Sequence, residues 1–286
     1  MVRFYIFLVI AMAFWGSSWV SAKVLSGFIT AQELIFYRYM VTSITLFPIL
    51  LYLKKDFKIN IYNALLALIA TFFLIAYSIF FFDGAKYGTA GLGGAFVTTL
   101  NPIVTFIVVA LISRKKLSKK DIFALALGAV GVMTILNIWQ YSFDEIFVKA
   151  NLYFVFAAFT WTFLTITNSK IKKIDHLVFS FYLYLFTTIV GYFLTNFQNG
   201  NILKFDYIFW INFLIISVGS TTFATSIYFI SISKIGANKA SSFIFLVPFN
   251  AIFLSYIFLD EKIYFTTIIG TIMSVIAVYI LNKGKK

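Results

Sequence analysis

Residues 86–111 read KYGTAGLGGAFVTTLNPIVTFIVVAL, and this stretch indicates a membrane helix with two unlike halves. Its first half is made largely of Gly, Ala and Thr, which lets neighbouring backbones approach closely, as at small-residue membrane interfaces. Pro102 then interrupts the apolar run, where it removes a backbone donor and bends the helix. A weaker copy, residues 234–259, has Lys, small residues, Pro248 and an apolar tail. Two matching broken helices predict a transporter built from two repeats.

The composition places the chain in a membrane. Of its 286 residues, 62% are hydrophobic and 12% charged, whereas soluble domains carry about 25% charged residues. The chain has no Cys, which excludes disulfides, thiolate chemistry and Cys-based metal sites. Its one histidine, His176, excludes a site that needs two imidazoles. We therefore expect neither a metal nor a cofactor.

Charged residues divide the chain into segments near the length of a membrane span, which is about 20 residues. A further apolar segment, about 33–53, carries Glu33 and Arg38 near its start. We therefore predict an all-α integral membrane protein with ten transmembrane helices, at 4–22, about 33–53, 59–82, 87–113, 122–143, 150–169, 177–203, 207–233, 240–259 and 263–282.

The basic residues predict the orientation. Most of the 23 Lys and Arg residues fall at the two termini and in the links near 54–60, 113–121, 170–175 and 234–239. The positive-inside rule places these segments in the cytoplasm, so both termini are predicted to be cytoplasmic and the protein to lie in the inner membrane of the cell. The basic links then face anionic lipid, which explains the net charge of +13 without nucleic acid. We therefore expect no nucleic-acid partner.

The second half of the chain restarts the pattern of the first. We divide it into residues 1–143 and 144–286, and Trp161 in the second half corresponds to Trp15 in the first. Each half has five predicted helices, an odd number, so the halves enter the membrane from opposite sides. This predicts two inverted five-helix repeats with a binding site where they meet.

Small and hydroxyl-bearing residues mark particular helix faces. Gly128 and Gly131, and likewise Gly270 and Ser274, predict packing faces rather than binding sites. The span 207–233 is rich in Ser and Thr, and on a regular α-helix its hydroxyls at 217, 221 and 225 share one face.

Several motifs resemble the EamA family of the drug/metabolite transporter superfamily. They are FWGSSWVSAK (residues 14–23) followed by ELIFYRYM (33–40), the segment 85–102, and the segment 231–261. The resemblance covers essentially the whole chain and implies ten helices, an inverted repeat, cytoplasmic termini, and export of amino acids or other small metabolites through a central cavity. Glu261 matches the acidic residue that the family has after the ninth helix. After the fourth helix this chain has Arg114, Lys115 and Lys116 instead.

We therefore expect a secondary transporter whose partners are a small-molecule substrate and the lipid bilayer. Aromatic walls with few charges suit a small, partly apolar zwitterion. Pro102 and Pro248 are expected to act as hinges or as fixed kinks. The candidate substrate-binding residues come from six predicted spans and are Trp15, Ser18, Tyr77, Thr98, Asn101, Trp161, Thr165, Thr225, Tyr228 and Asn250.

Glu33 and Arg38 are candidates for coupling or gating. Arg38 has three readings: an interfacial anchor, a partner for a carboxylate on another helix, or a cation facing an aqueous cavity. No carboxylate or His is visible at mid-membrane depth, so facilitated export or exchange is as plausible as proton antiport. A channel and a lipid-active enzyme are the alternatives, but one His and ten scattered acids do not supply the clustered groups of such an enzyme. For the oligomeric state of this protein, we expect a monomer rather than a dimer.

Overall fold

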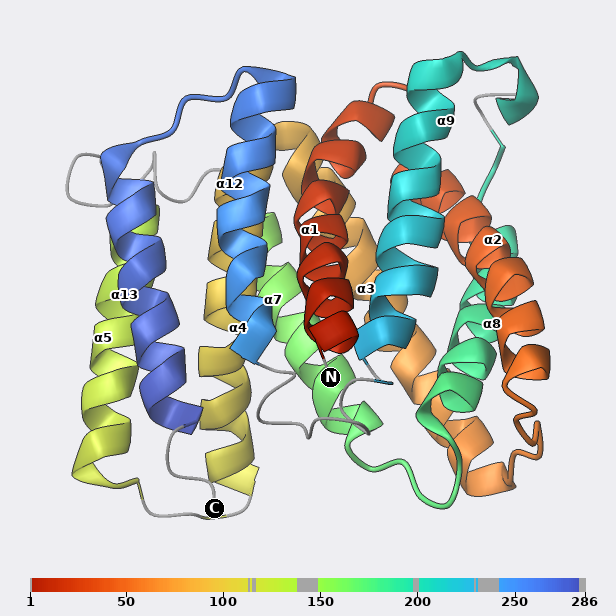
Figure 1. The fold of residues 1–286 in the computed structure, drawn as a ribbon, viewed down its shortest axis with the longest axis horizontal. Coiled ribbons are helices and arrows are strands. Elements are labelled where there is room, and N and C mark those ends of the chain that lie inside the picture. The colour runs from red at the N-terminus through yellow and green to blue at the C-terminus, as the bar shows by residue number, and fades with distance from the viewer. Residues whose placement is uncertain are drawn as a thin grey trace.

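The computed structural model describes residues 2–112, 114, 117–137, 149–197, 201–228, 230 and 242–282, and the regular secondary structure within these ranges is all helical. Ten α-helices lie side by side within the described part of the chain (Figure 1). Seven described spans are long and apolar enough to cross a membrane, and two shorter apolar helices, α12 and α13, accompany them. The prediction of an all-α membrane bundle is confirmed.

The helices follow the predicted spans closely. Each half contributes five of them, separated by the undescribed residues 138–148, which include the predicted boundary between 143 and 144. The first half holds α1 (Val2–Leu25), α2 (Ala31–Tyr52), α3 (Ile61–Tyr87), α4 (Ala90–Ile112) and α5 (Lys119–Ile135). The second half holds α7 (Lys149–Asn168), α8 (His176–Leu194), α9 (Tyr207–Leu214) continued by η2 (Ile215–Ala224), α12 (Leu246–Leu259) and α13 (Phe265–Asn282), with short 3-10 turns η1 (Ile202–Lys204) and η3 (Ser242–Phe245).

The pairing of helices reflects the two-repeat architecture. Equivalent helices of the two halves pack on each other: α2 on α8, α4 on α12, and α5 on α13. Non-equivalent helices pack in exchanged pairs, because α3 lies along α7 while α1 lies along η2. In Figure 1, α5 and α13 stand together at one edge and α2 and α8 at the other. Most of the extensive contacts therefore join one half to the other.

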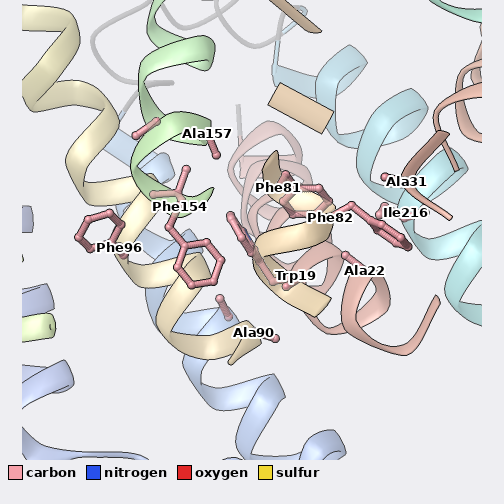
Figure 2. Close-up of a cluster of buried hydrophobic side chains, with 14 of the residues drawn as sticks. Trp19, Ala22, Ala31, Phe81, Phe82, Ala90, Phe96, Phe154, Ala157 and Ile216 are labelled. Carbon is pink, nitrogen blue, oxygen red and sulfur yellow. The ribbon is translucent and has the colours of Figure 1, made fainter. Parts of the chain in front are cut away.

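The Gly-rich start of α4 packs as its sequence predicts. A Cβ on Gly93 would lie 2.5 Å from the ring of Phe154 and 3.0 Å from Trp19, so only glycine fits there. Phe154 is fully buried, and Trp19 packs edge-to-face on Phe81 with ring centroids 4.6 Å apart. Figure 2 shows Trp19 and Phe154 in one cluster with Ala90 and Phe96 of α4. Because the glycines at the start of α4 have no side chains, aromatic rings from α1 and α7 fit against this helix.

The predicted packing faces of the fifth and tenth spans meet each other. A Cβ on Gly131 would collide with Ser274, and Gly270 lies against the backbone of Gly131 and Ile135. A Cβ on Gly128 would lie 2.6 Å from Ile103 of α4. The small-residue faces of α5 and α13 therefore pack against other helices of the same bundle.

Three expectations need correction. Residues 215–224 form a π-helix, so the expectation that Ser217, Thr221 and Thr225 share a face of a uniform α-helix is wrong. Pro248 lies in the first turn of α12, just after η3, and not in mid-helix, so its missing N–H interrupts no helix interior. The span predicted at 177–203 ends as a helix at Leu194.

Candidate functional site

A buried cation marks the junction of the two halves. Arg38 lies about two turns inside α2, and only 8% of its surface is exposed. Its Nε and Nη2 donate to Thr221 Oγ1 at 3.0 and 2.9 Å, and Thr221 in turn donates to the carbonyl of Ile216. The interpretation of Arg38 as an interfacial anchor is therefore wrong. Within the described ranges no carboxylate lies within 4 Å of it, so pairing with an acid is not observed either.

Aromatic and hydroxyl groups surround this guanidinium. Arg38 Cζ lies 5.3 Å from the ring centroid of Tyr39 and 5.9 Å from that of Phe81, within the range of cation–π attraction. The side chains of Tyr77 and Tyr184 are near enough to interact with its charge. We call this group the Arg38 cluster, and its members are Arg38, Tyr39, Tyr77, Ser78, Phe81, Tyr184 and Thr221.

Contacts from both halves hold the cluster in place. The hydroxyl of Tyr39 bonds to that of Ser78 at 2.9 Å, which joins α2 to α3. The ring of Tyr39 also stacks on Tyr184 of α8, with centroids 5.5 Å apart and planes 19° apart. The stacked and bonded rings restrict the rotamers of the side chains beside Arg38.

The π-helix provides the partner of Arg38. Threonine hydroxyls within it donate to the carbonyl five residues back, from Thr221 to Ile216 and from Thr222 to Ser217. Its wider turn makes such i−5 bonds possible, and π-helical segments occur often at functional sites. One and two turns after Arg38 on the same face of α2, Thr42 donates to the Ser217 carbonyl and Thr45 bonds to Thr222. These two contacts pack α2 against η2 without touching Arg38.

Besides Tyr77, three of the predicted binding residues lie at this junction. Trp15 Nε1 donates to the carbonyl of Ser220 at 3.1 Å, next to the residue that binds Arg38. The ring of Trp15 lies 5.3 Å from that of Tyr228. Thr225 interacts with Tyr184 of the Arg38 cluster. The structure thus links residues of α1, α8 and the span Tyr207–Tyr228 to the residues that contact Arg38.

Tyr77 and Trp161 form a second aromatic pair beside the cluster. Their ring centroids are 4.5 Å apart, and Tyr77 also stacks on Phe81 at 5.7 Å. Because Phe81 flanks Arg38, this pair extends the aromatic surroundings of the cation towards α7. About a third of the surface of Trp161 is exposed.

Asn101 makes a separate contact between the halves. Its Nδ2 donates to the carbonyl of Ala158 on α7 at 3.4 Å, and its Oδ1 accepts from Thr105. Thr105 also bonds to Thr162 of α7. Asn101 therefore belongs to a polar seam between α4 and α7, next to Pro102.

The other predicted residues bond to their own helices. The hydroxyl or amide group of each donates to a carbonyl three or four residues earlier, and this applies to Ser18, Thr98, Thr165 and Asn250. The Thr165 side chain is exposed, while Ser18 is buried. Asn250 lies against Gly16, next to Trp15, because a Cβ on Gly16 would lie 2.6 Å from its Cβ.

Glu33 has a clear local role. It completes a capping box at the start of α2, in which Thr30 accepts from the Glu33 backbone and Glu33 accepts from the Thr30 N–H at 2.8 Å. Only 2% of Glu33 is exposed. The capping box fixes the entry of α2, and the coupling role of Glu33 stays a prediction.

The candidate set omitted Tyr39, Tyr184 and Thr221. The sequence pointed to these residues only indirectly, through an arginine within an apolar span. Such a charge requires polar or aromatic neighbours from other helices, but the sequence does not say which residues they are. Thr221 was recognised as part of a hydroxylated helix, but its partner lies 183 residues away.

Apolar helices in two halves that meet at a buried polar cluster are the architecture of many helical membrane transporters. The model of the EamA-like transporter family matches residues 2–137 and 148–283. The chain is also 24% identical over 293 residues to "Uncharacterized transporter YetK" of Bacillus subtilis (strain 168), covering 99% of this chain and 87% of the relative. A solved crystal structure aligns with a TM-score of 0.66 at 12% identity, over 97% of this chain and 96% of that one, which shows a shared fold.

The chain therefore belongs to the EamA-like transporter family, within the drug/metabolite transporter superfamily. It is a multi-pass membrane protein, and its family consists of transporters. The expected family and fold are confirmed.

Proposed function

We propose that this protein is a secondary transporter that exports small metabolites, such as amino acids or similar amphipathic compounds, by alternating access. The observation that carries the proposal is the buried Arg38 cluster, because it is built from α2 and α3 of one half and from α8 and η2 of the other. A charged side chain inside an apolar helical bundle is energetically costly, and such residues commonly mark a substrate or ion pathway. The transporter family supports the same conclusion.

Movement of the halves against each other would expose the cluster to one side at a time. The α4–α12 pair and the helices that flank it would rock, with Pro102 and Pro248 as the hinge candidates. Coupling to protons and facilitated exchange are both compatible with the described residues, and Glu33 is the first residue to test for protons. In Glu33→Gln, a changed pH dependence of efflux would support proton coupling, and an unchanged one would refute its role.

For the repeat organisation we keep residues 1–143 and 144–286 as the two units, and we place the protein as a monomer in the inner membrane with cytoplasmic termini. The packing of α5 on α13 supports a monomer, since it uses small-residue faces within one bundle. The basic link 53–60 supports the orientation.

The natural absence of Cys makes the orientation easy to test. Single cysteines at the exposed residues Lys58 and Lys262, on links at opposite ends of the bundle, would be treated with a membrane-impermeant maleimide in intact cells. We expect labelling at 262 only, and labelling at 58 only would reverse the orientation.

The function itself is tested by efflux from proteoliposomes loaded with amino acids and common metabolites, with and without a pH gradient. Selective, protein-dependent loss of a few compounds would establish the carrier and its substrate class. Retention of every compound by folded, reconstituted protein would contradict the proposal.

A further inference from the structure

The guanidinium of Arg38 has unused donors. Of its five N–H groups, the Nε–H and one Nη2–H point to Thr221 Oγ1, and in the described part of the chain the other three have no protein acceptor. The side chain is nevertheless more than nine-tenths buried. A buried polar group with free donors is poised for a ligand that supplies acceptors.

Within the described ranges the charge of Arg38 also has no acidic side chain at ion-pair distance. Two ion pairs seen there, Lys55 with Asp175 and Lys58 with Asp56, lie in links outside the helices and do not involve Arg38. A buried cation without a counter-ion is strongly disfavoured, and an incoming anion removes the penalty. The aromatic rings of Tyr39 and Phe81 attract the cation but accept no charge-assisted hydrogen bond from it.

We propose that Arg38 is the anion subsite of the transporter and that the substrate is a small monocarboxylate with an apolar body. This inference rests on the proposed function and specifies its substrate class. The planar fork of a guanidinium matches a carboxylate with two parallel hydrogen bonds. A single cation balances one negative charge, which favours a carboxylate over a doubly charged phosphate ester.

The neighbours of Arg38 define the remainder of the ligand. Tyr39, Tyr77, Phe81 and Tyr184 supply aromatic surface for an apolar body, and Trp15 with Tyr228 continues it along the span Tyr207–Tyr228. The cluster itself has no carboxylate to receive an ammonium group. An α-ammonium is therefore not required for recognition, which distinguishes this proposal from a site selective for zwitterions.

Binding is tested on purified protein by the ligand-induced rise in unfolding temperature, with two matched series. One series is 3-phenylpropionate, its primary amide, phenylalanine, 2-phenylethylamine and phenyl phosphate. The other is 4-methylpentanoate with its amide and amine. We expect saturable stabilisation by 3-phenylpropionate, by phenylalanine or by 4-methylpentanoate, and none by the amides or amines. Equal stabilisation by an acid and its amide would overturn the proposal, as would a lack of response to every carboxylate. Preference for phenyl phosphate would overturn its monocarboxylate part.

Variants separate binding by Arg38 from a structural role. Arg38→Gln should weaken carboxylate binding about tenfold or more, and Arg38→Lys, which keeps the charge but loses the fork, should retain part of it. Thr45→Val is the matched control, because it removes another hydroxyl contact between α2 and η2 that does not touch Arg38. Undiminished binding in Arg38→Gln would overturn the subsite. Should Arg38→Gln fail to fold, the acid–amide comparison in the wild type and the Arg38→Lys result decide.

Efflux distinguishes this inference from the function on which it rests. If the wild type exports carboxylates and Arg38→Gln exports them equally well, the subsite is wrong and the transporter stands. If carboxylates stabilise the protein through Arg38 but no compound leaves the proteoliposomes, the transport proposal fails and the binding site stands.

Discussion

Glu261, in the link after α12, accepts a hydrogen bond from the backbone N–H of Gly91 at 2.8 Å. Its other carboxylate oxygen accepts from Ala90 N–H at 2.7 Å, so one side chain of the second half caps the start of α4 in the first half. The first N–H groups of a helix lack intrahelical partners and carry a partial positive charge, which makes a carboxylate a favourable cap. The contact ties the two halves together at one end of the α4–α12 pair.

Glu261→Gln should weaken this tie while keeping the shape of the side chain. We expect a stability loss on the order of 1 kcal/mol, because a charged acceptor is replaced by a neutral one. A lower unfolding temperature of purified protein and an altered efflux rate are the readouts. Asp260→Asn is the control, since it removes the neighbouring exposed charge at a residue with φ of 52°, which Asn tolerates. Equal effects of the two variants would show that the cap contributes nothing specific.

Gly93→Ala should destabilise the bundle by about 1–3 kcal/mol, because its Cβ would lie 2.5 Å from the buried ring of Phe154. Phe154→Leu should partly rescue it by vacating space, and the double mutant measures the coupling. Gly27→Ala is the matched control, as its Cβ would meet only an ordinary contact at 3.4 Å. Thermal unfolding in detergent provides the comparison, and a neutral Gly93→Ala would refute the close approach.

Trp15→Ala should abolish efflux while the yield of protein stays normal. The indole bridges α1 to the Ser220 carbonyl and lies against Tyr228, so its removal opens the surroundings of the Arg38 cluster. Trp15→Phe keeps the ring but loses the N–H and should retain part of the activity. Full efflux by Trp15→Ala would remove this residue from the site.

Asn101→Leu should also abolish efflux, for a different reason. The substitution removes the amide that joins α4 to Ala158 of α7 and leaves Thr105 without that acceptor. Thr134→Val, which removes a hydroxyl that donates to the Val130 carbonyl of its own helix, is the control. Normal transport by Asn101→Leu would show that the α4–α7 seam is not part of the pathway.

Acid should weaken one link at the opposite end of the bundle. Burial alone would raise the pKa of Asp175, but hydrogen bonds from the Lys55 ammonium at 2.5 Å and from Leu177 N–H outweigh it and hold the pKa below the ordinary value of 3.8. A lowered folded-state pKa means that the stabilisation is present above the unfolded-state pKa and is lost as pH falls through the folded-state pKa.

Asp175→Asn isolates this charge, because Asn also caps helices well and Asp175 is the N-cap of α8. We expect the variant to unfold at a lower temperature than the wild type near pH 7, with the difference shrinking as pH falls below the ordinary carboxyl pKa of 3.8. Asp56→Asn, in the exposed pair with Lys58, should change little at any pH. A difference that persists in acid would contradict the assignment.

The sequence by itself determined the membrane class, the positions of the helices and the packing of small residues. These properties are local: an apolar run of sufficient length must satisfy its backbone as a helix in lipid, and glycines such as Gly93 and Gly131 mark where backbones approach. The two-repeat pattern was readable for the same reason, since each half repeats one order of motifs. The residue types of Trp15 and Asn101 suggested a site but not their contacts.

Only the tertiary structure decided what surrounds Arg38. Its bond to Thr221 joins residues 183 apart and depends on a π-helix that α-helical periodicity does not predict. Glu261 likewise meets Gly91 only because α4 and α12 lie side by side. Hydropathy specifies that a residue enters the membrane, but the partner of a buried polar group is set by the packing of helices distant in sequence, which no single segment encodes.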